Sequence, residues 1–196
     1  MQNRWTSLLV GVALSGATHL ALGDGNQSPN SPPPTNTLAI YLVTDRVPVE
    51  SIIHGTTTPA GLKLATTPLV SDTDFKSYDL TTHTFTVPAP IGAKIVTAGF
   101  EHGPAPFVLV AGGQSIYVGV FTTSASSTSS DLPTIEVGIP GADERGAYGF
   151  TIDRGYPGPN GFGRGEDRRT DPRIVAAAAK LFPKKGQTTT ASPGSK

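Results

Sequence analysis

Two runs of strand-forming residues, 107–111 and 114–121, flank a Gly112-Gly113 pair near the middle of the chain. A Gly-Gly pair between such runs is typical of the two-residue turn of a β-hairpin. The pattern therefore predicts a hairpin over residues 107–121. Its simplest register pairs Ala111 with Gln114, Leu109 with Ile116, Val108 with Tyr117 and Phe107 with Val118.

Both faces of this predicted hairpin are apolar, whereas a half-solvated antiparallel sheet alternates apolar and polar positions. In the simplest register one face carries Phe107, Leu109, Ile116, Val118 and Val120, and the other carries Val108, Val110, Tyr117 and Phe121. Two interpretations follow. Either the hairpin lies in the middle of a sheet, with helix on one side and irregular chain on the other, or the second face is an interaction face for a partner.

Shorter patterns predict the rest of the fold. Residues 38–43, 83–87 and 134–139 are short β-rich runs, and the first of these is expected to be a central strand. Pro90 begins a modest helical pattern that ends at Gly99. The expected class is α+β, with a small mixed, largely antiparallel sheet and one helix layer.

A second helix is predicted over residues 172–182, because Asp171 is a good N-cap and Pro172 suits the first helical position. Its apolar stripe should dock on the rest of the fold. The stripe consists of Ile174, Val175, Ala178, Leu181 and Phe182.

Composition changes along the chain predict its organisation. Residues 1–23 have the layout of a signal peptide, with Arg4 before an apolar run and a small-residue cleavage site, although an uncleaved N-terminal anchor is the alternative. A Pro/Ser/Asn-rich linker covers 24–37, the α+β domain covers 38–140, and 184–196 is expected to be a disordered tail.

The segment between the domain and the tail, residues 141–183, is predicted to be an extended arm that ends in the short helix. It is rich in Gly, Pro and Arg, which disfavours regular structure. Its aromatic residues could lie on an open sheet face, or the segment could be a disordered Arg/Gly tract that binds a partner. These aromatic residues are Tyr148, Phe150, Tyr156 and Phe162.

Charge and cysteine content narrow the function classes. The 196 residues carry a formal net charge of zero, which disfavours a nucleic-acid partner. There is no cysteine, so disulfides and a lipid-modified cysteine are excluded. After signal cleavage we expect no integral membrane segment, and the sequence leaves the oligomeric state open.

Catalytic and metal-binding signals are weak. His83, His102 and Asp79 are the candidates for acid–base chemistry, and Asp79 is more simply explained as a turn contact of His83. The histidines lack metal-ligand spacing, and no G-x-S-x-G motif is present. We therefore expect no metal and no cofactor.

Three segments carry a family resemblance: PLVSDTDFKSYD at 68–79, THTFTV at 82–87, and GPAPFVLVAGGQSIYVGVF at 103–121. With the DPRI stretch at 171–174, they resemble a group of small exported bacterial proteins of uncharacterised function. More remotely, they are similar to the periplasmic head subdomain of the SecD preprotein translocase subunit. The resemblance implies a mixed α+β sheet with helix on one side and a role related to protein export.

Together these observations favour an exported, non-enzymatic binding or structural domain of the cell envelope, with another envelope protein as partner. The alternative is a secreted hydrolase that uses a His/Asp pair.

Overall fold

The computed structural model describes residues 37–48, 51–52, 58–100, 105–127, 129–138, 146–158 and 166–183. The predicted signal peptide, the tail and all but the last residue of the linker lie outside these ranges. The described elements, in chain order, are β1 (Leu38–Leu42), the short 3-10 helix η1 (Pro59–Gly61), β2 (Ser77–Asp79), β3 (Thr84–Pro88), α2 (Ala89–Phe100), β4 (Ala105–Ala111), β5 (Gln114–Thr123), β6 (Thr134–Val137), β7 (Ala147–Asp153), the 3-10 helix η2 (Arg168–Thr170) and α3 (Pro172–Leu181).

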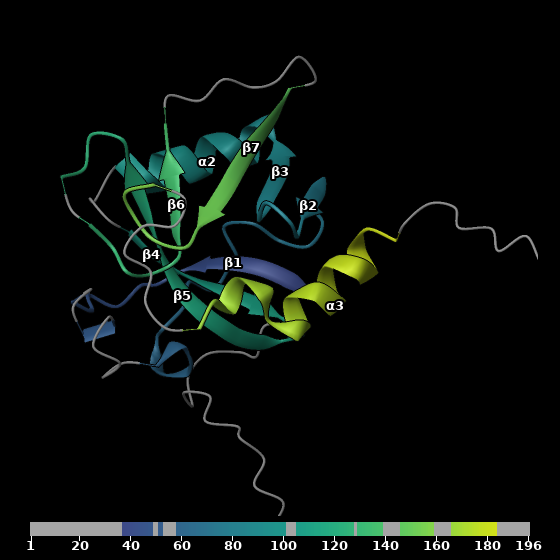
Figure 1. The fold of residues 1–196 in the computed structure, drawn as a ribbon, viewed down its shortest axis with the longest axis horizontal. Coiled ribbons are helices and arrows are strands. Elements are labelled where there is room, and N and C mark those ends of the chain that lie inside the picture. Colours follow the sequence, from purple (N-terminus) through teal and green to yellow (C-terminus); the bar gives the residue numbers. More distant parts are fainter. Residues whose placement is uncertain are drawn as a thin grey trace, which may run out of the picture.

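The strands form one curled, seven-stranded sheet in the order β1-β4-β5-β6-β7-β3-β2 (Figure 1). Only the β5–β6 pair is parallel, and the other neighbours are antiparallel. The predicted α+β class with a mixed, largely antiparallel sheet is therefore confirmed. No helix among the described residues is long and apolar enough to cross a membrane.

Strand β1 lies at one end of the sheet, so its prediction as a central strand was wrong. Its outer edge is nevertheless occupied. Single β-bridges join Ile40 to Val70 and Val43 to Leu64, and the backbone N–H of Ile40 donates to the carbonyl of Val70 at 2.9 Å. These short contacts protect the edge from pairing with another chain.

Strands β4 and β5 are antiparallel and are joined at Gly112-Gly113, whose φ angles of 58° and 77° suit a type I′ turn. The predicted register holds only next to this turn. A β-bulge after Leu109 makes Ile116 the extra residue, so that Leu109 lies opposite Tyr117 rather than Ile116, and Val108 lies opposite Val118. The register predicted for the rest of the hairpin was therefore wrong by one residue.

The bulge decides which side chains face the interior, because a one-residue shift exchanges the two faces of a strand. Tyr117 and Phe121 lie in the main core with Phe107 and Leu109. Val118 lies on the opposite side of the sheet. The sequence had placed Tyr117 and Phe121 with Val108 and Val110 on the other face.

Both faces of the β4–β5 pair are covered. The main core contains Ile95 of α2 and Ile174 of α3, together with Phe85 and Phe150 from the far half of the sheet. The opposite face packs against residues of the segment 43–64 in a smaller cluster that we call the outer cluster. It consists of Ala39, Tyr41, Ile52, Leu62, Val108, Val110 and Val118, with Val43, Val47, Leu64 and Leu132 packed around them.

The predicted extended arm is partly a strand. Strand β7 lies inside the sheet between β6 and β3, and Phe150 pairs with Phe85 at a ring-centroid distance of 5.6 Å. Tyr156 packs near β5, where its hydroxyl donates to the carbonyl of Ser126 at 3.3 Å, while Phe162 lies outside the described residues. The expectation that residues 141–182 cover the second sheet face was wrong, because the segment 43–64 covers it.

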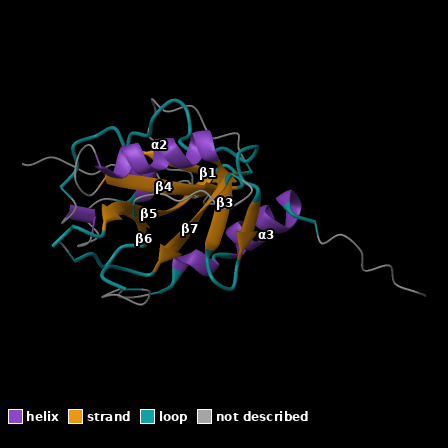
Figure 2. Cartoon of the chain, turned by 90° about the horizontal axis from the view of Figure 1, so that it is seen from above, coloured by secondary structure: helices purple, strands orange, loops and turns teal. Residues whose placement is uncertain are grey.

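The two helices lie at separate places around the strands (Figures 1 and 2). α2 contacts β3, β5, β6 and β7, whereas α3 contacts β1 and β4. Asp171 caps α3 by accepting from the backbone N–H of Arg173 at 2.9 Å, as its sequence position indicates. The buried face of α3 is formed by Ile174, Ala177 and Ala178, while Val175, which we had placed in the stripe, is 41% exposed.

Gly92 explains how α2 approaches the sheet so closely. A Cβ atom at this position would lie 2.4 Å from Cγ of Tyr148 on β7. The glycine that weakens the helical pattern is therefore needed for packing.

We expect Gly92→Ala to lower the free energy of unfolding by about 1–3 kcal/mol, because Tyr148 or the helix must move. At a helical position with room for a Cβ atom, the same change raises the free energy of unfolding by about 1 kcal/mol. A decrease therefore indicates that the added Cβ atom clashes with Tyr148. Urea denaturation measures it, with Gly149→Ala on β7 as the control, since no atom lies within 4 Å of a Cβ there. A stabilised Gly92→Ala variant would contradict this packing.

Candidate functional site

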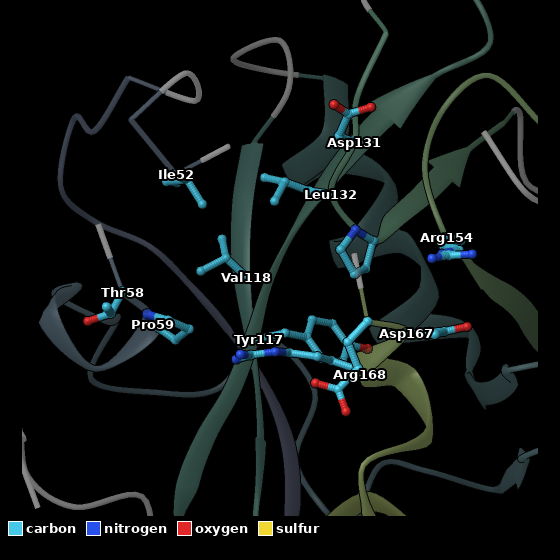
Figure 3. Close-up of a pocket in the computed structure, with 12 residues that line it drawn as sticks. Ile52, Thr58, Pro59, Tyr117, Val118, Asp131, Leu132, Arg154, Asp167 and Arg168 are labelled. Atoms are coloured by element: carbon cyan, nitrogen blue, oxygen red, sulfur yellow. The ribbon is translucent and has the colours of Figure 1, made fainter. Parts of the chain in front are cut away.

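A cleft of about 440 Å³ opens beside β5 (Figure 3). Ile52, Pro59 and Val118 lie on one side of it, Arg154 and Asp167 lie on the other, and the ring of Tyr117 lies between them. The volume is in the range of small-molecule and peptide sites. The full lining consists of Ile52, Thr58, Pro59, Tyr117, Val118, Asp131, Leu132, Pro133, Arg154, Glu166, Asp167 and Arg168.

The cleft lies beside the part of β5 that pairs with β4 but not with β6. β6 pairs only with residues 120–123 of β5, and the last backbone contact on this side is the N–H of Val120 donating to the carbonyl of Pro133 at 2.9 Å. Farther along, the Arg168 guanidinium donates from Nη1 to the carbonyl of Ile116 at 3.4 Å. The strand edge at Val118 lies between these two contacts.

A buried ion pair lies behind the cleft. Arg169, only 8% exposed, donates from Nε and Nη2 to the two carboxylate oxygens of Asp167 at 2.8 and 2.6 Å. Its remaining nitrogen, Nη1, donates to the carbonyl of Ile152 on β7 at 2.8 Å. Arg169 thereby links η2 to the sheet, and each of its three guanidinium nitrogens donates a hydrogen bond.

The bidentate contact with Arg169 lowers the pKa of Asp167 to about 2, even though partial burial opposes the shift. A carboxyl whose pKa is lower in the folded state than in the unfolded state stabilises the fold above its unfolded pKa, near 4. This contribution is lost as the pH falls through about 2. The pair is therefore formed across the neutral range.

Three buried polar atoms around this ion pair have no hydrogen-bond partner among the described residues: the hydroxyls of Tyr78 and Tyr117 and Nδ1 of His83. The charges of Arg169 and Asp167 act on the pKa of all three side chains, so these five residues form one group, which we call the polar cluster. Leaving a buried hydroxyl unpaired costs about 1–3 kcal/mol. In folded proteins the bonding of such groups is completed by ordered water, an ion or a ligand.

Burial is the main cause of the pKa shifts within the polar cluster. It raises the pKa of Tyr78 to about 12 and that of Tyr117 well above its usual value. It lowers the pKa of His83, and the positive charge of Arg169 lowers it further. At neutral pH both hydroxyls are protonated donors and His83 is uncharged. The only formal charges in the cluster are those of Asp167 and Arg169.

Asp79 and His83, the two catalytic candidates that the structure describes, do not form a hydrogen-bonded dyad. Asp79 accepts from the backbone N–H of Thr81 at 2.7 Å, and this bond is the main cause of its lowered pKa. His83 lies at the end of the same turn with φ of 54°, and its Nδ1 has no hydrogen-bond partner in the described part of the chain. His102 lies outside the described residues. Asp79 therefore shapes the β2–β3 turn, and no hydrogen bond from it orients His83.

The predicted interaction face is divided by the sheet. Val108 and Val110 belong to the outer cluster, and Tyr117 and Phe121 belong to the main core. All four are buried, the most accessible being Tyr117 at 3% exposure. Of these four residues, only Tyr117 lines the cleft.

Sequence reasoning missed Asp167 and Arg169, although a local signal was present. The chain contains Asp-x-Arg three times, at 143–145, 167–169 and 171–173, and the first copy lies outside the described residues. In the two described copies the Asp caps a short helix and pairs with the Arg two residues later. Only the fold distinguishes them, since it buries the Arg169 side chain and leaves that of Arg173 48% exposed.

No group of three or more metal-ligating side chains occurs in the part of the chain that the structure describes. The polar cluster supplies one histidine and one carboxylate, and that carboxylate is already used by Arg169. Its donors and neutral hydroxyls suit hydrogen bonding to an uncharged polar ligand better than metal coordination.

We expect Asp167→Asn to lower the free energy of unfolding by about 2 kcal/mol at pH 7, because it leaves the Arg169 cation buried without its counter-charge. The loss should shrink as the pH falls from about 4 toward about 2, where the wild-type carboxyl becomes protonated. Denaturant titrations at several pH values measure both effects.

The matched control is Asp171→Asn. Asn is an equally good N-cap, and the ion pair that this change removes involves the exposed Arg173, so the cost should be below about 0.5 kcal/mol. Equal losses in the two variants would show that burial of Arg169 is unimportant.

We expect Tyr117→Phe to raise the stability of the free protein by about 1 kcal/mol, because it removes an unpaired buried hydroxyl. Tyr156→Phe is the control and should be destabilising, since the Tyr156 hydroxyl donates to two backbone carbonyls. Thermal unfolding of both variants tests this. A loss of stability in Tyr117→Phe would mean that its hydroxyl is bonded in the free protein.

Comparison with known proteins adds no relative to this picture. No protein-family model, no curated protein and no solved structure matches the chain. The function is therefore argued from the geometry of the cleft and the polar cluster.

Proposed function

We propose that the chain is an exported, non-enzymatic domain of the cell envelope that binds an uncharged polar ligand in the cleft beside β5. The observation that carries this proposal is the Tyr117 side chain. It lines the cleft, and its buried hydroxyl lacks a hydrogen-bond partner among the described residues. The hydroxyl is closed to solvent in the free protein, and a ligand that reaches past the ring to accept from it would recover the free energy lost by its burial.

The chemistry of the cleft supports binding more than catalysis. A general base needs a partner that holds it in place, and Asp79 is engaged with the turn instead of with His83. Burial and Arg169 both keep His83 uncharged, and none of the described residues bonds its Nδ1. The carboxylate of the cluster, Asp167, is held as an anion by Arg169, which makes it a poor proton carrier at neutral pH.

The export part of the proposal rests on residues 1–23, whose charged start, apolar run and small-residue site are typical of a signal peptide. The partner or ligand would then belong to the cell envelope. A link to protein export, which the resemblance to the SecD head implied, stays a prediction.

Blocking the cleft tests the binding proposal. Thr58 is exposed at the cleft rim and its side chain does not cap η1, so Thr58→Trp should fill the cleft with little effect on folding. The control is Val175→Trp on the exposed side of α3.

The probe is a library of uncharged small molecules and terminally blocked peptides, screened by amide chemical shifts of the full chain. We expect binders that shift the Tyr117 and Val118 signals, with affinity lowered at least about tenfold by Thr58→Trp and unchanged by Val175→Trp. A library without any binder at these residues, or binders insensitive to Thr58→Trp, would contradict a ligand site in the cleft.

A further inference from the structure

The register of the sheet determines where the backbone of Val118 points. In an antiparallel pair, the N–H and C=O groups of one residue point to the same side, and this side alternates along the strand. The N–H of Val120 donates to the carbonyl of Pro133, on the side of β5 that faces away from β4. Pro106 lies opposite Val120 on β4, and its carbonyl accepts from the N–H of Val43, on the side of β4 that faces β1. Two residues before Val120, the N–H and C=O of Val118 must also point away from β4.

This direction leads into the cleft. Val118 is a lining residue, and the β5–β6 pairing begins only at Val120. Within the described residues, no strand lies opposite Val118 on this side. One donor and one acceptor of a strand backbone are thus presented to the cleft, in the spacing that the backbone of another strand would match.

We propose that the ligand of the cleft is an extended peptide segment that adds to the edge of β5 and forms backbone hydrogen bonds with Val118. This inference rests on the proposed binding function and specifies its ligand class. A strand is the partner whose own N–H and C=O satisfy both groups at once, which is the basis of binding by strand addition.

The two walls of the cleft specify the side chains of the peptide. Neighbouring residues of a strand point to opposite faces. On one face of β5, the apolar side chains of Val118, Leu132 and Ile52 would contact an apolar residue of the peptide. On the other face, the peptide would contact the ring of Tyr117, whose hydroxyl is closed to solvent in the free protein. A small residue lets the peptide approach the ring, so the expected sequence alternates apolar and small residues.

The charges at the rim favour an uncharged segment. Asp131 and Glu166 are acidic, Arg154 and Arg168 are basic, and the fifth charged lining residue, Asp167, is already paired with Arg169. The formal charges of the first four cancel, so neither an acidic nor a basic peptide gains from the rim as a whole.

The test uses terminally acetylated and amidated pentapeptides randomised over Gly, Ser, Thr, Val and Leu, bound to the full chain. For the tightest binder, each backbone nitrogen is methylated in turn. Methylation at the residue opposite Val118 removes a donor, so affinity should fall at least about tenfold there, and methylation at its neighbours, whose N–H groups point away, should change affinity less than about threefold.

Amide hydrogen exchange gives an independent measurement on the unmodified protein. Exchange of the Val118 amide should slow at least about tenfold when the peptide binds. The Gly119 amide is the internal control, because its register position directs it to β4 in the free protein as well, and its exchange should change little.

The outcomes separate this inference from the proposed function. Peptides or small molecules that shift the Tyr117 and Val118 signals, but show no position-dependent effect of N-methylation and no protection of the Val118 amide, would overturn strand addition and leave the cleft as a binding site. A library in which nothing binds at these residues would overturn both.

Discussion

The fold depends on the burial of both faces of the β4–β5 pair. Seven consecutive residues of β5, 116–122, are buried, and so are five of the seven residues of β4. A strand pair of this composition is stable only if each face is covered by other parts of the chain. The curled sheet and the two helices cover one face, and the segment 43–64 covers the other.

The curling of the sheet brings several polar side chains together in its interior. It brings β2 and the β2–β3 turn to the side of β5 that carries Tyr117, and η2 places Arg169 between them and β7. A cation in this position needs a full set of acceptors, and Asp167 with the Ile152 carbonyl provides them. In the same interior, the two tyrosine hydroxyls and Nδ1 of His83 have no hydrogen-bond partner among the described residues. The ion pair that stabilises this region and these hydroxyls and imidazole therefore share one buried environment.

The cleft arises from a mismatch of strand lengths. β5 has ten residues and β6 has four, so a stretch of β5 has a strand on one side only. An unprotected edge of this kind risks uncontrolled pairing between chains. Here the Arg168 guanidinium contacts the Ile116 carbonyl and the Pro133 carbonyl accepts from Val120, so that among the described residues the edge without a strand neighbour is confined to Val118, which is 4% exposed. A short, buried edge of this kind is protected from uncontrolled pairing.

Local sequence signals determined several elements by themselves. Pro90 and the pair Asp171-Pro172 mark helix starts because they satisfy or avoid the free N–H groups of a first turn. Glycines at 112 and 113 permit the positive φ angles of a tight turn. The alternation of Tyr148, Phe150 and Ile152 was also a strand signal, although the surrounding glycines and prolines pointed to an irregular arm.

The tertiary structure alone decided the side on which each residue of β5 lies and which Asp-x-Arg pair is buried. A bulge of one residue leaves the hydrophobic pattern unchanged but moves Tyr117 and Phe121 to the other face. The sequences 167–169 and 171–173 cap their helices in the same way, and only the position of η2 against β7 separates Arg169 from Arg173. Local patterns record backbone preferences, whereas the cleft and the polar cluster depend on contacts between residues that are distant in the sequence.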